Sequence, residues 1–351
     1  MPNATPATTP TVTAPAAAPA GDRSGGRALA RTLIQLLGFG VGVLLLVWAA
    51  RTALKPEYRE QLTRLASAPW EGLGLLALLC VATVVLNGLV FRATLAPVRL
   101  LPAGDMIAVN ALSTTLSYLP FKLSLIVRVL IHMRRHGLPL LVIGSWFAAV
   151  IAGFGASYLP ALGASLWLRR VDALWFAVLL AGCAGAVAAI VLGARFMGRG
   201  RVWERLTALA PARVLPPAAA EKLRSALVML ADARAVTLTV GLRLTDLFVQ
   251  SARFYVAGRL VGQPVPAGDA VLAAATFFVI QSLSPAGILG AREAGTIGLF
   301  NLLHSPTMAV VTLAVSAVEA LVNLVFATGA AAYLRLDRVL RAPVARAGAG
   351  S

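Results

Sequence analysis

The sequence is poor in charge for its length. Only 13% of its 351 residues are Asp, Glu, Lys or Arg, whereas 59% are hydrophobic. A soluble globular protein carries about 25% charged residues, so this chain cannot cover an exterior that faces water on all sides. We therefore expect much of its surface to face lipid, in an all-α polytopic membrane protein without a large soluble domain.

The sequence also lacks the motifs of common catalytic and metal sites. It has no Walker lysine loop, no H-E-x-x-H, no G-x-S-x-G and no cysteine pair with zinc spacing. Cys80 and Cys183 each lie inside an apolar run and are expected to be small core residues. His132 and His136 are four apart, but we expect solvated interface histidines there rather than a metal site. We predict no metal, no cofactor and no enzyme, unless chemistry occurs at the membrane surface.

The few charges are mostly of one sign. Lys and Arg number 31 against 14 Asp and Glu, which gives a net charge of +17. The arginines lie between apolar segments rather than on one face of a soluble domain, so they do not indicate nucleic-acid binding. They fit anionic lipid headgroups and the positive-inside rule.

Apolar runs define the expected spans. About 20 residues cross a bilayer, and six runs are long enough to do so: 32–50, 70–91, 138–159, 171–192, 236–257 and 308–334. We expect a disordered cytoplasmic tail at 1–30, because it is rich in Ala, Thr and Pro. A transmembrane domain at 31–334 includes an amphipathic cytoplasmic connection at 194–235, and a second cytoplasmic tail follows at 335–351.

Two more apolar segments, 106–119 and 270–283, are too short or too polar to cross comfortably. Each ends at or just before a proline, Pro120 or Pro285, and a second short segment follows it. A helix, a break and a shorter helix indicate a re-entrant hairpin.

Charge placement tests these hairpins. With six crossings and two hairpins, 19 basic residues lie on the cytoplasmic side, together with both termini, and seven lie outside. Converting either hairpin alone to a full crossing moves arginine-rich loops outside, against the positive-inside rule. The hairpins then enter from opposite sides, as in transporters built from inverted repeats, whose sites lie near the midplane.

The second hairpin contains the first set of candidate site residues. Arg292 and Glu293 are adjacent opposite charges at membrane depth, where they need protein partners or a water-filled cavity. Gly287 and Gly290 leave backbone N–H groups approachable, and a helix N-terminus there favours an anion. This indicates a pocket for a phosphate headgroup with Arg292 as donor. The alternative is a structural lock that holds the hairpin to its neighbours.

Other membrane-depth polar residues are further candidates. In the first hairpin these are Lys122 and Arg128, with Asn110, Ser113, Thr114 and Ser117 on the preceding segment. Lys122 and Arg128 could instead extend to the inner headgroups, and Tyr118 is expected at the interface. In the later spans the candidates are Asp246, Gln250 and Arg253 on one helical face, and Glu319 with Asn323 on another. For Asn87 we expect an interhelical hydrogen bond.

These residues resemble those of a known family. The pattern Pro285, Gly287, Gly290, Arg292, Glu293 is similar to the strongest motif of the transmembrane region of lysylphosphatidylglycerol synthases and their stand-alone, flippase-like relatives. Leu119, Pro120, Lys122 and Arg128 match a weaker motif of that family, from which Ser124 and Leu125 depart. The resemblance covers residues 31–334 and implies the lipid-translocating part without the soluble aminoacyl-transferase domain.

The expected function is therefore translocation of a phospholipid or another lipid-linked anionic substrate across a bacterial inner membrane. An accessory or catalytic subunit in lipid-linked glycan, isoprenoid or aminoacyl-lipid synthesis is the alternative, and a structural scaffold is a third. The expected partners are the anionic lipid itself and a second copy of the chain or a lipid-biosynthesis protein.

Overall fold

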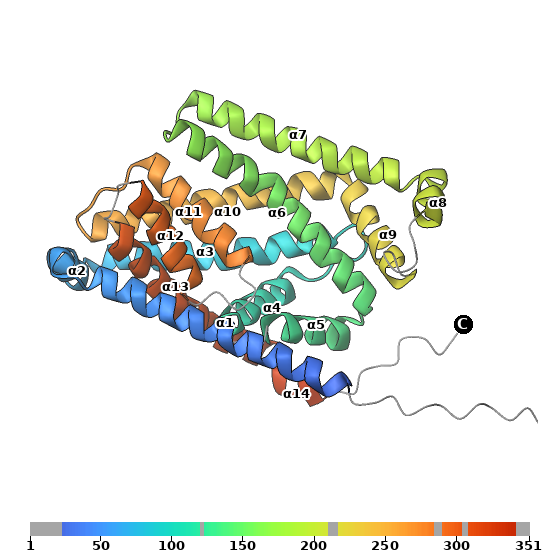
Figure 1. Cartoon of the computed structure of the whole chain (residues 1–351), viewed down its shortest axis with the longest axis horizontal. Coiled ribbons are helices and arrows are strands. Elements are labelled where there is room, and N and C mark those ends of the chain that lie inside the picture. The colour runs from blue at the N-terminus through green and yellow to red at the C-terminus, as the bar shows by residue number, and fades with distance from the viewer. Residues whose placement is uncertain (1–22, 120–122, 210–216, 284–289, 304–307, 342–351) are drawn as a thin grey trace, which may run out of the picture.

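The computed structural model describes residues 23–119, 123–209, 217–283, 290–303 and 308–341, and all regular secondary structure in these ranges is helical (Figure 1). Its elements are α1 Arg23–Ala53, η1 Pro56–Tyr58, α2 Arg59–Ala66, α3 Trp70–Leu95, α4 Ala103–Leu116, α5 Leu123–His136, α6 Leu140–Leu168, α7 Ala173–Met197, α8 Gly200–Leu209, α9 Pro217–Ala231, α10 Ala233–Leu260, α11 Ala267–Leu283, α12 Ala291–Leu302, α13 Met308–Tyr333 and α14 Leu336–Arg341.

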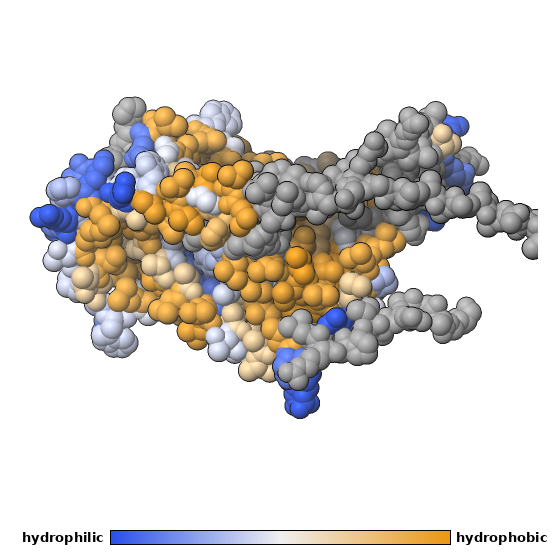
Figure 2. Space-filling view, turned by 60° about the horizontal axis from the view of Figure 1, so that its bottom comes forward, coloured by the Kyte–Doolittle hydropathy of each residue, from blue (hydrophilic) through white to orange (hydrophobic). Residues whose placement is uncertain are grey.

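The long helices make the chain a multi-pass membrane protein. Within the described residues α3, α6, α7 and α13 are long and apolar enough to cross a membrane, and up to six spans result if each of two bent helix pairs counts as one. The bent pairs are the end of α1 with η1–α2 and the end of α9 with α10. Figure 2 shows hydrophobic residues over the middle of one face and hydrophilic residues gathered toward its ends. This distribution is what a bilayer requires of a protein that crosses it.

The boundaries differ from the sequence prediction at both ends. Helix α1 already begins at Arg23, inside the stretch predicted as a disordered tail, and residues 1–22 lie outside the described part. Helix α14 lies inside the stretch predicted as the second tail. Helix α1 extends past its apolar run because its polar flank contains no proline, whereas α14 is a separate short helix that follows Arg335, whose φ is +48°.

The two interrupted segments form helix pairs. Helices α4 and α5 flank one break, and α11 and α12 flank the other, while residues 120–122 and 284–289 lie outside the described part. Helix α4 packs against α3 and α13, and α11 packs against α10, α12 and α6. A close approach joins α3 to α4, since a Cβ on Gly88 would lie 2.7 Å from the Cα of Ile107.

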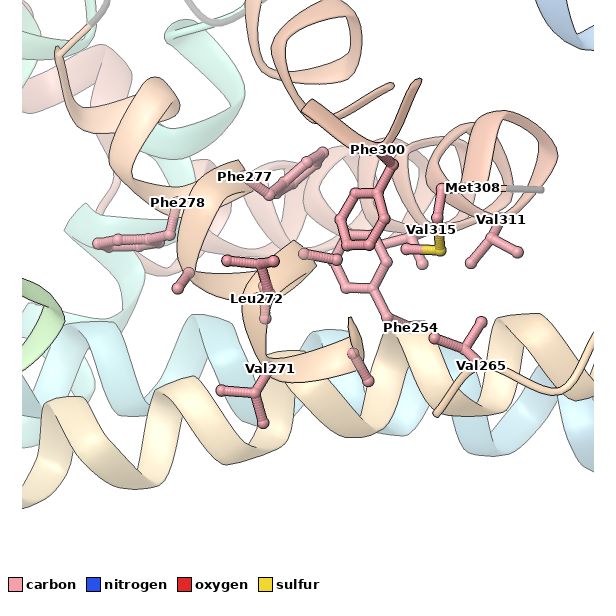
Figure 3. Packing of buried hydrophobic residues seen from close by; sticks show 14 of the residues in the cluster. Phe254, Val265, Val271, Leu272, Phe277, Phe278, Phe300, Met308, Val311 and Val315 are labelled. Carbon is pink, nitrogen blue, oxygen red and sulfur yellow. The ribbon is translucent and has the colours of Figure 1, made fainter. Parts of the chain in front are cut away.

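Helix α11 lies inside the bundle rather than on its surface. Its residues from Ala270 to Ala275, together with Phe277, are at most 4% exposed. Figure 3 shows Val271, Leu272, Phe277 and Phe278 of α11 packed with side chains of α10, α12 and α13. The middle of this 17-residue helix is thus enclosed by protein and belongs to the core of the bundle.

The predicted short amphipathic helices of the long connection are present as α8 and α9. Helix α9 does not simply lie in the headgroup layer, because it packs against α6 and α7. Its Met229 is 1% exposed and belongs to the same core cluster as Trp146. The apolar face of α9 therefore meets protein, which the sequence pattern alone did not indicate.

Candidate functional site

A buried polar face runs along the middle of α10. Asp246 is fully buried, and its Oδ2 accepts a hydrogen bond from Gln250 Nε2 at 2.9 Å and one from Asn87 Nδ2 of α3 at 3.3 Å. Arg243 donates to Asn87 Oδ1, and its Nη1 lies 3.7 Å from Asp246 Oδ2. These contacts confirm the interhelical role expected of Asn87 and join α3 to α10.

Further along the same face, a carboxylate of α13 joins two arginines. Glu319 Oε2 pairs with Arg253 of α10, and Glu319 Oε1 accepts from Arg292 Nη1 of α12 at 2.7 Å. All three side chains are at most 9% exposed. Removing one partner of such a bridge leaves a buried charge uncompensated, at a cost of roughly 3–5 kcal/mol. Glu319 therefore ties the second helix pair to the long helices.

The guanidinium of Arg292 is nearly saturated by protein partners. Its Nε donates to Glu293 Oε1 at 2.9 Å, its Nη1 also donates to Gln281 Oε1 at 2.9 Å, and its Nη2 donates to Tyr118 Oη at 3.0 Å. With the bond to Glu319, four of its five N–H donors are in use. In this arrangement Arg292 holds together α11, α12, α13 and the segment that follows α4.

Arg128 of α5 has a different environment. Its Nη2 donates to Asn110 Oδ1 at 2.9 Å and its Nε lies 3.3 Å from Ser113 Oγ. The guanidinium carbon lies 3.9 Å from the ring centroid of Phe91 and 6.0 Å from that of Phe147. Among the described residues no carboxylate pairs with Arg128, although its side chain is buried. The positive charge of Arg128 is thus surrounded by neutral amide, hydroxyl and aromatic groups.

A cavity of about 430 Å³ lies beside these buried polar groups. It lies between α3, α4, α5, α6, α10, α11 and α13. Its lining includes Arg128, Arg243, Gln250, Arg253, Glu319, Asn110, Ser113, Thr114, Ser117, Gln281 and Asn323. Arg243 Nε and Arg253 Nε are buried without a hydrogen-bond partner in the described structure. Three arginines, Arg128, Arg243 and Arg253, thus contribute to the lining of this cavity.

The buried charges do not balance. We define the buried charge cluster by its described members, Arg128, Arg243, Arg253, Arg292, Asp246, Glu293 and Glu319. With every group ionised, four arginines face three carboxylates, and the excess positive charge is on Arg128. Because an isolated buried charge is expensive, an excess of this kind favours binding of an anion.

The structure brings most of the predicted site residues together. Arg128, Asn110, Gln250, Arg253 and Glu319 line the cavity. Arg292 and Glu293 lie behind the lining and are linked to it through Gln281 and Glu319. Gly287 and Lys122 are outside the described residues.

Gly290 faces another helix. Its φ is +75°, and a Cβ there would lie 1.9 Å from the carbonyl oxygen of Gly42 in α1. The structure therefore uses this glycine for a close approach between α1 and the start of α12. The predicted exposure of its backbone N–H to a headgroup stays a prediction.

The sequence did not single out two residues of this site, and it misplaced a third. Arg243 was not recognised, although it is an arginine within an apolar run. Gln281 was not recognised either, and it accepts a hydrogen bond from Arg292. Tyr118 is not an interface anchor, because its hydroxyl accepts from Arg292 inside the bundle.

The histidine pair also differs from expectation. His132 and His136 are buried rather than solvated, with their Nδ1 atoms 3.1 Å apart, and His136 Nε2 lies 3.0 Å from Asp105 Oδ2. The expectation failed because Asp105 is 31 residues earlier in the chain, on α4, and meets His136 only through the pairing of α4 with α5. Arg135 binds both oxygens of the same carboxylate. No group of three or more His, Cys, Asp or Glu in the described ranges could hold a metal ion.

Comparison with known proteins adds no name to this site. No family model matches the chain, and no curated protein or solved structure matches it. Its function has to be argued from the cavity and the charges around it.

Proposed function

We propose that this protein moves a lipid, or a lipid-linked molecule, with an anionic headgroup from one leaflet of the membrane to the other. The observation that carries the proposal is the buried Arg128, which has no carboxylate partner among the described residues and lines a polar cavity within a multi-pass helical bundle. An anionic headgroup on Arg128 neutralises the buried charge cluster. The acyl chains remain in the surrounding lipid, where they cost nothing to solvate.

The proposed topology has six crossings, α1, α3, α6, α7, α10 and α13, and two re-entrant pairs, α4–α5 and α11–α12. It is supported by the break within each short pair and by the burial of the middle of α11, from Ala270 to Phe278. Irregular backbone is tolerated at membrane depth only where it is buried in protein or lines a cavity. Both termini are then cytoplasmic, in a bacterial inner membrane, as the distribution of arginines favours.

The members of the buried charge cluster have two kinds of role in this proposal. Arg128 meets the headgroup, because it lines the cavity and has no carboxylate partner among the described residues. Arg243 and Arg253 also line the cavity, but they lie beside Asp246 and Glu319 respectively. Arg292, Glu293 and Glu319 hold α12 and α13 in place through their mutual ion pairs. The resemblance of Pro285–Glu293 to flippase-like proteins supports the same class of substrate, while the pairing of Arg292 supports the lock that was its alternative.

Reconstituted vesicles test this proposal. The purified protein is incorporated into phosphatidylcholine vesicles that contain a trace of phosphatidylglycerol with a fluorescent acyl chain, and dithionite bleaches only the probe in the outer leaflet. We expect bleaching to proceed past the outer-leaflet fraction with protein present, and to do so faster for phosphatidylglycerol than for labelled phosphatidylcholine. Bleaching that stops at the outer-leaflet fraction for both lipids contradicts the proposal for glycerophospholipids.

A further inference from the structure

The cavity has an exposed rim on one side. Of the described residues that line it, three are exposed: Leu125 on α5, Ile151 on α6 and Ser282 near the end of α11. The remaining described lining residues are buried or half-buried. The opening therefore lies between α5, α6 and the end of α11.

In the proposed topology this opening lies deep in the membrane rather than at its surface. Ile151 is 11 residues from the start of α6 at Leu140, which places it about 17 Å along a helix that rises 1.5 Å per residue. Leu125 lies in the first turn of α5, beside the break between α4 and α5. Both side chains are apolar and well exposed, at 67% and 42%. At this depth they contact lipid chains, not water.

Two helix faces connect the rim to the arginine. On α5, Leu125 and Arg128 are three residues apart and share a face. On α6, Phe147, Ile151 and Phe154 are spaced by four and three residues, so they also form one stripe, and all three line the cavity. The apolar path from the rim thus ends at Phe147, whose ring lies 6.0 Å from the Arg128 guanidinium carbon.

We infer that the opening between α5, α6 and the end of α11 is a lateral portal, occupied by a glycerophospholipid whose phosphate meets Arg128 and whose acyl chain lies against Phe147, Ile151 and Leu125. This inference rests on the proposed function and adds the route by which the lipid reaches the cavity. Charge and polarity argue for this occupant, because the portal joins a buried cation, which has no carboxylate partner among the described residues, to a rim where Leu125 and Ile151 are exposed. A free inorganic anion matches the cation but leaves the apolar path without a ligand.

Photo-crosslinking tests the portal. A benzophenone amino acid replaces Ile151 in one variant and Leu159 in a matched control, since both residues are exposed on α6, at 67% and 61%, and only Ile151 lines the cavity. The full-length protein is reconstituted in phosphatidylethanolamine–phosphatidylglycerol vesicles with either lipid radiolabelled at its phosphate. We expect the Ile151 variant to capture phosphatidylglycerol severalfold above its share of the membrane, and Arg128→Gln to abolish that preference. The Leu159 variant should capture both lipids in proportion to the membrane, with or without Arg128→Gln.

The outcomes separate the portal from the proposed function. Capture at position 151 that follows membrane composition and ignores Arg128→Gln overturns the portal, even if the protein moves lipid. Selective capture that depends on Arg128, without any transbilayer movement in the bleaching assay, supports the portal as a lipid-binding site and overturns translocation. Size-exclusion profiles of all variants are compared with that of the unsubstituted protein. Matching profiles establish that the variants at positions 151 and 159, with and without Arg128→Gln, are equally folded.

Discussion

The guanidinium of Arg128 lies over the ring of Phe91, with 3.9 Å between its central carbon and the ring centroid. Arg292 has a similar aromatic partner, since its guanidinium carbon lies 4.3 Å from the ring centroid of Phe277, but it also pairs with Glu293 and Glu319. A cation held by an aromatic face and neutral oxygens retains most of its charge for a ligand. This difference assigns binding to Arg128 and support to Arg292.

The first prediction concerns Glu319. Glu319→Gln removes the carboxylate shared by Arg253 and Arg292, so two buried guanidinium groups lose their main counterion. We expect a loss of stability of roughly 3–5 kcal/mol, seen as a markedly lower melting temperature in detergent micelles. Glu60→Gln is the control, because its pair with Arg64 is exposed and is expected to contribute about 1 kcal/mol or less. Equal melting temperatures for both variants contradict the bridging role.

The second prediction concerns Gly290. Gly290→Ala places a Cβ within 1.9 Å of the Gly42 carbonyl oxygen and at a φ of +75°. We expect α1 to separate from α12, with a lower melting temperature and faster proteolysis of α1. Gly298→Ala lies on the same helix with no atom within 4 Å of the added Cβ, and it is expected to gain about 0.5–1 kcal/mol from helix propensity. If Gly290→Ala leaves the melting temperature and the proteolysis of α1 unchanged, α1 and α12 do not approach closely at this glycine.

The third prediction concerns pH and His136. Burial lowers the pKa of His136, and the nearby Asp105 only partly offsets this effect. Burial also raises the pKa of Asp105, but hydrogen bonds from Arg135 and His136 bring it below its usual value. Because a carboxylate only accepts, neutral His136 carries its proton on Nε2, and its Nδ1 accepts from His132.

Protonation of His136 on Nδ1 removes the acceptor that His132 uses in this tautomer, and Arg99 and Arg135 add repulsion. The unfolded chain binds this proton more readily, so stability is expected to fall as pH drops below about 6.5. We expect the melting temperature to decrease from pH 7.5 to 5.5, and to decrease less in His136→Gln. An identical decrease in both proteins shows that His136 does not cause it.

The fourth prediction concerns the portal. Ile151→Trp adds bulk to the rim between α5 and α6, where it is expected to slow the movement of fluorescent phosphatidylglycerol severalfold. Leu159→Trp, on the same helix and outside the cavity lining, should leave the rate unchanged. If both variants move the lipid at the same rate as the unsubstituted protein, the lipid does not pass this rim.

Much of the fold could be predicted because hydrophobic length and proline position are local signals. The apolar runs locate all six long helices, and Pro120 and Pro285 mark the breaks between α4 and α5 and between α11 and α12. The packing of α9 on α6 could not be predicted, since an amphipathic face fits a lipid surface and a protein surface equally well.

For the site, the distribution of basic residues along the chain is the strongest sequence signal. It assigns 26 of the 31 basic residues to one side of the membrane or the other and leaves five unassigned: Lys122, Arg128, Arg243, Arg253 and Arg292. The four that the structure describes all belong to the buried charge cluster. Their partners could not be predicted, because pairing depends on how α10, α12 and α13 are rotated about their axes. The meeting of Asp105 with His136 depends in the same way on how α4 and α5 pair.

The most direct test of the account is the rate of phosphatidylglycerol movement in vesicles that contain Arg128→Gln protein. A hydrogen bond to a charged group contributes about 1.5–3 kcal/mol, so we expect the initial rate to fall roughly 10-fold to 100-fold. Arg338→Gln, at an exposed position on α14, should keep the rate of the unsubstituted protein. An Arg128→Gln protein that folds and moves phosphatidylglycerol at the full rate contradicts the claim that this arginine binds the headgroup.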